Sequence, residues 1–499
     1  MHQWSRPTPD LALAGISRSP WLSARVLAPL LTFVVLGFFG ILLYSGPARL
    51  SSLVDLQQII VFECLLIAVV AVAPLLVRKL SRQALDPLEP GAIFVMVYVI
   101  VFCVRPLFVR SEWVSYMERT VMEVFWFFSL QDSEVALTLF YGLVGLVCFH
   151  LGYRTWQDPL AVALPDHRVR PWSSRRVTRV AWAGIAFAVL SFFLVIPVIS
   201  QVDTVLDQFG RFRDLLLGHG YQGLGMDLLV ILVLILWVDH LVGHRRGLVI
   251  PLLIISNVYN LFLGSRAGIF NLWIFLYLAH RYLREKKFDW RRSLAGVFVA
   301  TAAVFSALSI ALLRNEGIRY WGDAARSLKD YWLYTPLGVI LANLLLEFNQ
   351  FDIFAMVVGF GSRQFPFLWG QSYLEMFYQP IPRALWPAKP WPFDVHIGEL
   401  ITGTRTGIPP GIVGELYLNF HIVGIILGMF LFGVLCRVGY QRALARPRDP
   451  GKVLLYALLL PYLPIMMLRS FVGGGTTVLV YLVPTWLALR YIQGQRVAS

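Results

Sequence analysis

Charged residues are scarce in this chain of 499 residues: they make up 14% of it, and only 29 residues are acidic. So little charge, beside 58% hydrophobic residues, excludes an ordinary soluble domain and a disordered chain. Cysteine is also rare, and the four cysteines lie within or beside long apolar runs without a close-spaced pair. This spacing excludes a cysteine zinc site and a disulfide framework, so we expect small buried hydrophobes.

Motifs of several enzyme classes are missing as well. The sequence has no P-loop, no nucleotide-binding glycine fingerprint, no H-E-x-x-H zinc motif, no G-x-S-x-G elbow and no D-x-D pair for a metal-bound nucleotide sugar. We therefore expect neither a metal nor a cofactor. The formal charge of +14 does not indicate nucleic-acid binding, because the basic residues lie in short blocks between apolar runs.

Long apolar runs are what the chain has instead. A bilayer core about 30 Å thick needs about 20 apolar residues per helix, so these runs predict an all-α polytopic membrane protein of about 12 transmembrane helices. The predicted spans are 26–45, 58–77, 91–109, 135–153, 180–200, 226–243, 248–264, 267–283, 294–313, 421–440, 453–469 and 477–490. We expect the first run to remain as an anchor, because it is too long for a cleaved signal peptide.

The distribution of Lys and Arg predicts the orientation. Cytoplasmic loops carry an excess of positive charge, and the larger share lies in the connections that are inside when both termini are cytoplasmic. The stretch 248–283 is interrupted only by Gly264, Ser265 and Arg266. One overlong helix there would place the basic block after it outside, so we predict two helices with a break at Gly264.

This topology divides the chain into transmembrane helices one to nine in 1–313, a large periplasmic segment in 314–420, and transmembrane helices ten to twelve in 421–499. Connections of this length usually carry function, so we expect the working site in the large segment. Residues 323–360 are predicted to be largely helical. The stretch 380–392 is rich in proline and tryptophan and is predicted to form a stiff, extended path.

Basic residues gather on the outer side, although the positive-inside rule disfavours them there. One explanation is that they bind a lipid pyrophosphate, because a guanidinium group can bind two phosphate oxygens at once. The other is that these side chains reach lipid headgroups or pair with nearby acids. The binding candidates are Arg266, Arg314, Arg363, Arg383, Lys389, Arg405 and Arg469. Arg105, within the third apolar run, either marks a functional site or reaches toward the outer surface.

Acids, one imidazole and aromatic rings complete the candidate set. Asp394, His396 or Glu415 is placed to take a proton from an attacking hydroxyl, and each is alternatively a solvated charge or a helix cap. Glu415 follows two glycines at the entry to an apolar helix, where an unpaired carboxylate is costly. Tyr373 and Trp386 suit stacking on sugars, although Tyr and Trp also gather at membrane interfaces.

Four strings resemble the Wzy-type O-antigen polymerases of bacterial inner membranes: GSRAG at 264–268, GQSYLE at 370–375, IPRALWPAKP at 381–390 and GIVGELYLNF at 411–420. The resemblance implies a fold like that of the C-type (lipid-donor) glycosyltransferases and a metal-independent enzyme at the periplasmic face. Such an enzyme moves a growing glycan from undecaprenyl pyrophosphate to a newly delivered repeat unit. Arginines, Arg266 and Arg383 among them, would hold the leaving pyrophosphate, and an acid or histidine would deprotonate the acceptor.

The same resemblance implies partners. These are undecaprenyl-pyrophosphate-linked oligosaccharides, membrane lipids, a polysaccharide chain-length regulator and a flippase, and no nucleic acid. The related O-antigen ligases place a histidine shortly before the glycine pair, whereas His396 stands well before Gly411. A transporter of lipid-linked sugars is a rival from another class, but no internal repeat is visible. A structural scaffold would leave the outer arginines unexplained.

Overall fold

The computed structural model describes residues 56–80, 86–109, 130–155, 172–199, 220–243, 247–262, 266–284, 329, 348–379, 381, 383, 385–403, 405–445 and 448–494. Every regular element in these ranges is a helix. The predicted spans 26–45 and 294–313 lie outside the described residues, as does most of the stretch 323–360 before α17.

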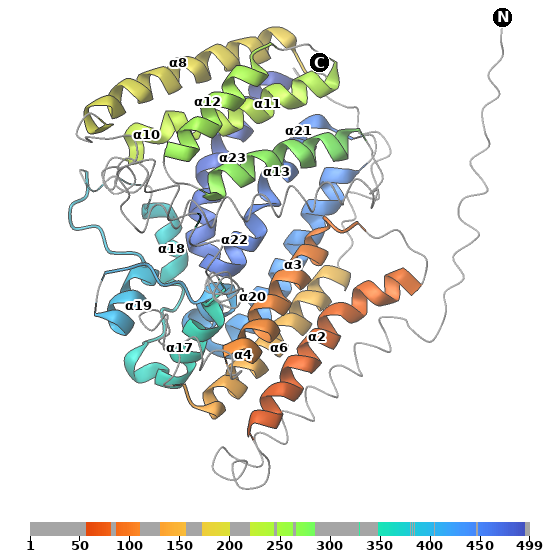
Figure 1. Ribbon diagram of the computed structural model, residues 1–499, viewed down its shortest axis with the longest axis vertical. Coiled ribbons are helices and arrows are strands. Elements are labelled where there is room, and N and C mark those ends of the chain that lie inside the picture. The colour runs from red at the N-terminus through yellow and green to blue at the C-terminus, as the bar shows by residue number, and fades with distance from the viewer. Residues whose placement is uncertain are drawn as a thin grey trace, which may run out of the picture.

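The helices are, in chain order, α2 (Leu56–Leu80), α3 (Pro90–Val99), the π-helical segment η3 (Ile100–Val104), α4 (Arg105–Val109), α6 (Asp132–Thr155), α8 (Ser174–Ile199), α10 (Gly220–Asp227), α11 (Leu229–Val242), α12 (Val249–Phe262), α13 (Arg266–Leu283), α17 (Gln350–Gln364), α18 (Gln371–Tyr378), α19 (Phe393–Thr402), α20 (Gly411–Leu444), α21 (Pro450–Leu459), α22 (Tyr462–Arg469) and α23 (Phe471–Gln493). Figure 1 shows α8 and α10 to α13 as one group and α2 to α6 as another. The C-terminal helices α20 to α23 contact both groups.

Seven helices of the described part are long and apolar enough to cross a membrane: Leu56–Arg78, Pro90–Leu107, Asp132–Arg154, Ser174–Pro197, Leu224–Val242, Gly411–Leu444 and Pro450–Arg469. Each coincides with a predicted span. Val249–Asn260 and Val478–Gln493 are shorter apolar helices at two further predicted positions. The prediction of an all-α, multi-pass membrane protein is confirmed. The count of about 12 spans and the sides that the loops face stay predictions.

Glycines bring α6 and α20 into close contact. A Cβ atom at Gly152 would clash with the carbonyl oxygen of Phe430, and one at Gly433 would clash with that of Phe149. Small residues allow helix backbones to approach in a bilayer, where packing replaces the hydrophobic effect as the force between helices. These two helices therefore form the tight centre of the bundle.

Helix α20 is interrupted in its first third. Phe420 and His421 have non-helical backbone angles, and His421 has a φ of 54°. The interruption separates a short buried segment, Gly411–Asn419, from the remainder of the helix, which is close to the predicted span 421–440. The short segment is thus free to point its side chains at α18 and α23 instead of following the long helix.

Two other predictions were tested inside the bundle. The stretch 248–283 forms two helices, α12 and α13, as predicted from the charge of the block that follows it. Arg105 does not reach the surface, because it is fully buried and its Nε lies 2.7 Å from Oδ2 of Asp352 in α17. Buried charges are paired in this way because desolvation penalises a lone ion.

Candidate functional site

Glu415, in the short first segment of α20, is the most enclosed acid of the candidate set. Its Oε1 accepts a hydrogen bond from Ser372 Oγ at 2.9 Å, and its Oε2 accepts from the backbone N–H groups of Phe471 and Val472. These two N–H groups open α23, so the carboxylate caps that helix at its positive end. Glu415 is 0% exposed. It has no open side for a substrate in this conformation.

Asn419 and Ser372 extend this network between α20 and α18. The Asn419 amide group donates to Ser372 Oγ at 2.8 Å and to the Glu415 carbonyl oxygen at 2.9 Å. Its Oδ1 accepts from Gly370 N at 2.8 Å, just before α18 begins. Because Ser372 Oγ accepts from the amide, its single proton is directed at Glu415. The network holds α18 in one position against the start of α20.

Glu375 is the second buried acid and lies one turn after Ser372 on α18. Its Oε2 accepts a hydrogen bond from Phe393 N at 3.1 Å, which is the first N–H of α19. Burial raises the pKa of the Glu375 carboxyl to about 7, and the charges of Asp394 and Glu415 act in the same direction. The hydrogen bond from Phe393 opposes this rise. Glu375 therefore caps α19 as Glu415 caps α23.

Asp394 lies in the first turn of α19 and is the least buried of the three acids. Its Oδ1 accepts from Val395 N at 2.9 Å, while its carbonyl oxygen accepts from Ile408 N at 3.0 Å. Burial raises the pKa of the Asp394 carboxyl, and the positive charge of Arg469 offsets part of that rise. Arg469 is exposed at the end of α22. An acid and a guanidinium group thus lie near each other at the rim of the buried network.

The described residues of the proline-rich stretch, 381, 383 and 385–392, form no helix, as predicted, but they are not an extended path. Lys389 is buried, and its Nζ donates to the carbonyl oxygens of Gln379 at 2.9 Å and Ile381 at 2.8 Å. Arg383 donates from Nη1 to the Lys389 carbonyl at 2.7 Å and from Nη2 to the Pro390 carbonyl at 3.3 Å. Both cations close the stretch into a compact loop, because its prolines leave carbonyl groups without backbone donors.

Trp391 joins this loop to α19 through two arginines. The Arg383 guanidinium lies 3.9 Å from the centroid of its ring, and that of Arg405 lies 5.6 Å from it. Arg405 also pairs with Glu399 on α19 at 3.3 Å. Cations stack on indole rings because of the ring's negative face. Arg383 and Arg405 therefore both contact the Trp391 ring, two residues before α19 begins.

The remaining candidates lie around this centre. The Tyr373 ring is 6.3 Å from that of Phe471, on the Glu415 side of α18. Trp386 is 38% exposed, and its ring lies 5.8 Å from that of Tyr378. His396 is exposed on α19, two residues after Asp394. The His396 side chain extends from a different face of α19 than the Asp394 side chain, since residues two apart on a helix do not face each other.

Three predicted arginines cannot be placed at the site. Arg266 is the first residue of α13 and Arg363 lies in α17, but the side chains of both are outside the described part. Arg314 lies wholly outside the described residues. Their role in binding stays a prediction.

Sequence reasoning missed Ser372, Glu375 and Asn419. All three belong to strings that carried the family resemblance, GQSYLE and GIVGELYLNF, but they were not singled out. Glu375 falls on the same face of a helix as Ser372, three residues earlier, and Asn419 on the same face as Glu415, four residues earlier. That spacing was the available signal. No group of His, Cys, Asp and Glu in the described ranges is arranged to hold a metal ion.

The resemblance to the O-antigen polymerases was tested by comparison with protein families. Residues 375–481 match the family model described as "Putative O-antigen polymerase". The resemblance to the O-antigen polymerases is confirmed over this part of the chain, which begins at Glu375 and includes Asp394, Glu415 and Arg469. No curated protein and no solved structure matches the chain.

Proposed function

We propose that this chain is a membrane glycosyltransferase that joins lipid-linked oligosaccharide repeat units into O-antigen or a related surface polysaccharide. The carrier is undecaprenyl pyrophosphate, and the reaction takes place at the periplasmic face of the bacterial inner membrane. One observation carries this proposal: the family match spans the residues that form the cluster of acids and arginines. A chain-length regulator and a flippase are the expected partners.

Asp394 is the residue that we assign as proton acceptor. Both oxygens of Glu415 accept hydrogen bonds, Glu375 caps α19 through its Oε2, and both residues are buried, so neither is open to an acceptor hydroxyl. Asp394 is partly exposed, and its raised pKa makes its carboxylate a stronger base than an ordinary aspartate. A base is most effective when its pKa approaches the working pH. Glu415 and Glu375 then act as positioning residues for α23 and α19.

Arg469 and Arg405 are the side chains that we assign to the pyrophosphate, because both are exposed and lie near α19. Arg383 already donates hydrogen bonds to two carbonyl groups, so its role is to orient the loop as well as to add positive charge. Guanidinium groups stabilise the charge that develops on a departing pyrophosphate.

The reaction transfers one glycosyl group. The acceptor hydroxyl of the new repeat unit attacks the anomeric carbon of the growing chain, and Asp394 takes the hydroxyl proton. A glycosidic bond forms while the bond from that carbon to the pyrophosphate oxygen breaks. The electron pair leaves with the lipid pyrophosphate, which the arginines neutralise. The growing chain is then one unit longer and attached to the carrier of the newcomer.

The test is a strain that lacks the chain's own gene and expresses single variants, with surface glycan lengths read on a gel. Asp394→Asn should leave only single repeat units attached, at unchanged protein abundance, because loss of a general base costs roughly 10²–10⁴ in rate. The control His396→Gln, two residues along the same helix, should still give long chains.

Other outcomes would point elsewhere. Deletion that leaves no glycan attached would indicate a ligase, and units trapped inside the cell would indicate a transporter. Long chains made by Asp394→Asn would contradict its assignment as the base while leaving the polymerase function intact.

A further inference from the structure

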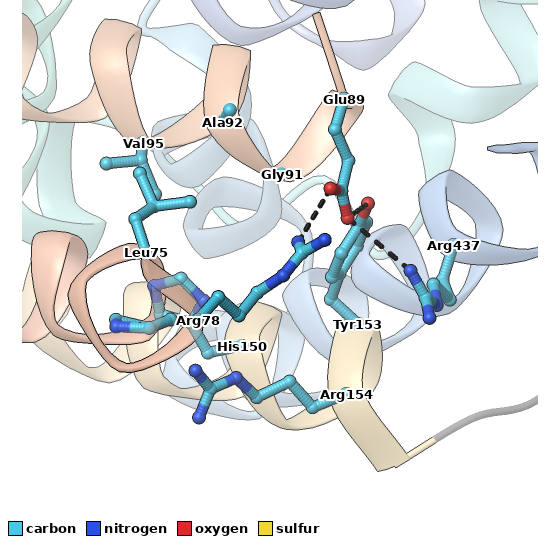
Figure 2. Close-up of a pocket in the computed structure, with 11 residues that line it drawn as sticks. Leu75, Arg78, Glu89, Gly91, Ala92, Val95, His150, Tyr153, Arg154 and Arg437 are labelled. Atoms are coloured by element: carbon cyan, nitrogen blue, oxygen red, sulfur yellow. Dashed lines mark hydrogen bonds and ion pairs between the residues drawn. The ribbon is translucent and has the colours of Figure 1, made fainter. Parts of the chain in front are cut away.

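A polar cavity lies beside the later part of α20, whereas the acid cluster lies at the start of that helix; Figure 2 shows the cavity. It opens between the end of α2, the start of α3, the end of α6 and the later part of α20, and its volume is about 210 Å³. One water needs roughly 10–15 Å³ by the same measure, so the space holds a group much larger than a water. We call it the arginine cavity after Arg78, Arg154 and Arg437, which line it.

One carboxylate, Glu89, organises the inner wall. It is 2% exposed and accepts from Arg78 Nη1 at 2.6 Å, from the Tyr153 hydroxyl at 2.6 Å and from Arg437 Nη1 at 3.4 Å (Figure 2). Arg437 also lies over the ring of Tyr153, with its Cζ 5.4 Å from the centroid. Two of the three arginines are therefore held in place by a single negative charge.

The cavity keeps a surplus of positive charge. Arg154 makes no ion pair or hydrogen bond with the described residues, and it is close enough to Arg78 for their charges to repel. His150, which also lines the cavity, has a buried Nε2 without a hydrogen-bond partner. Buried polar atoms and like charges of this kind are costly unless a ligand satisfies them.

The opposite wall is apolar. Pro74, Leu75 and Val95 line it, and all three belong to helices that qualify as membrane spans. Arg78 and Arg154 are the last residues of their spans, so the cavity lies at one edge of the predicted hydrocarbon layer. A ligand that fits has an anionic group for the arginines and an apolar part for the other wall.

From this geometry we propose that the arginine cavity binds the phosphate group of an anionic membrane lipid, with Arg154 as a direct ligand. The phosphate takes hydrogen bonds from Arg154 and from the outward donors of Arg78 and Arg437. The His150 ring donates to, or accepts from, the same headgroup. The lipid tail lies along the apolar wall. This site is separate from the proposed glycosyl transfer and does not depend on it.

The test measures the thermal unfolding midpoint of the full purified chain in detergent micelles. Phosphatidylglycerol should raise the midpoint, because a ligand that binds only the folded state stabilises it. Arg154→Ala should weaken the apparent affinity roughly tenfold, the effect of one charge-assisted hydrogen bond. Arg154→Gln serves as a second variant of similar length. Arg284→Ala, an exposed arginine at the end of α13, should bind as the wild type does.

Three results would overturn the proposal. An equal rise with inorganic phosphate at the same concentration would show that the ligand needs no lipid tail. An equal rise with phosphatidylcholine, whose choline cation cancels the phosphate charge, would show that lipid in general stabilises the chain. Unchanged affinity in both Arg154 variants would show that the phosphate does not bind in this cavity.

Discussion

Substitution of Glu415 distinguishes most clearly between a residue that positions a helix and a residue that takes a proton in the reaction. Replacing it by glutamine keeps the shape of the side chain and removes the charge. The one remaining oxygen can keep the two bonds from Phe471 N and Val472 N, whereas the amide nitrogen cannot accept the bond from Ser372 Oγ. A buried donor left without its acceptor costs about 1–3 kcal/mol, so loss of the Ser372 bond predicts a fall of that size in unfolding free energy.

The two roles predict different activities for Glu415→Gln. A positioning residue still holds α23 through its remaining oxygen, so the variant should retain glycan extension within about tenfold of the wild type once abundance is matched. A proton acceptor would lose roughly 10²–10⁴ in rate, because the amide cannot take the proton. Glu415→Ala, which leaves three buried donors without an acceptor, should cost more stability than the glutamine variant.

The assay pairs two readouts on the same preparations: thermal unfolding in detergent and the distribution of glycan lengths in cells. Asp394→Asn provides the opposite pattern, because a partly exposed acid should cost little stability and most of the activity. If Glu415→Gln proved as stable as the wild type yet inactive, the assignment of Glu415 as a helix cap would be refuted, and it would become the base.

Three further predictions test the acids and the packing. Glu375 alone should lower the unfolding free energy by about 3 kcal/mol between pH 4.5 and about 7, because the unfolded Glu375 carboxyl ionises in that window and the buried one does not. Burial raises the pKa of the Asp394 carboxyl as well, so pH titration of thermal unfolding should show a fall in the wild type and in Glu399→Gln and a fall smaller by about 3 kcal/mol in Glu375→Gln. Asp352→Ala should cost about 3–5 kcal/mol by removing the carboxylate that pairs with the buried Arg105, and adding Arg105→Met should recover part of that loss in the same measurement. Gly433→Ala should lower the unfolding midpoint by an amount equivalent to at least about 1–3 kcal/mol, since a methyl group there meets the backbone of α6; an unchanged midpoint would contradict the close approach of the two helices.

Much of the fold could be predicted from properties of neighbouring residues in the sequence. Hydropathy and length are summed over neighbouring residues, so the spans of the described part and the division of 248–283 into α12 and α13 followed from the sequence. Two of the four family strings, at 381–390 and 411–420, lie within the residues that match the family model, so these two carried the prediction of the family. The site was predicted less completely, because a list of acids and arginines does not say which of them meet.

The sequence by itself determined that this chain is a bundle of apolar helices, and it named most of the candidate residues of the described site. Only the tertiary structure decided their tasks. Lys389 and Arg383 turned out to hold backbone carbonyls, Glu415 caps a helix that begins at Phe471, and Arg105 finds its partner in Asp352. These pairings join residues distant in the chain. They depend on how the helices pack, whereas a span depends on its own residues alone.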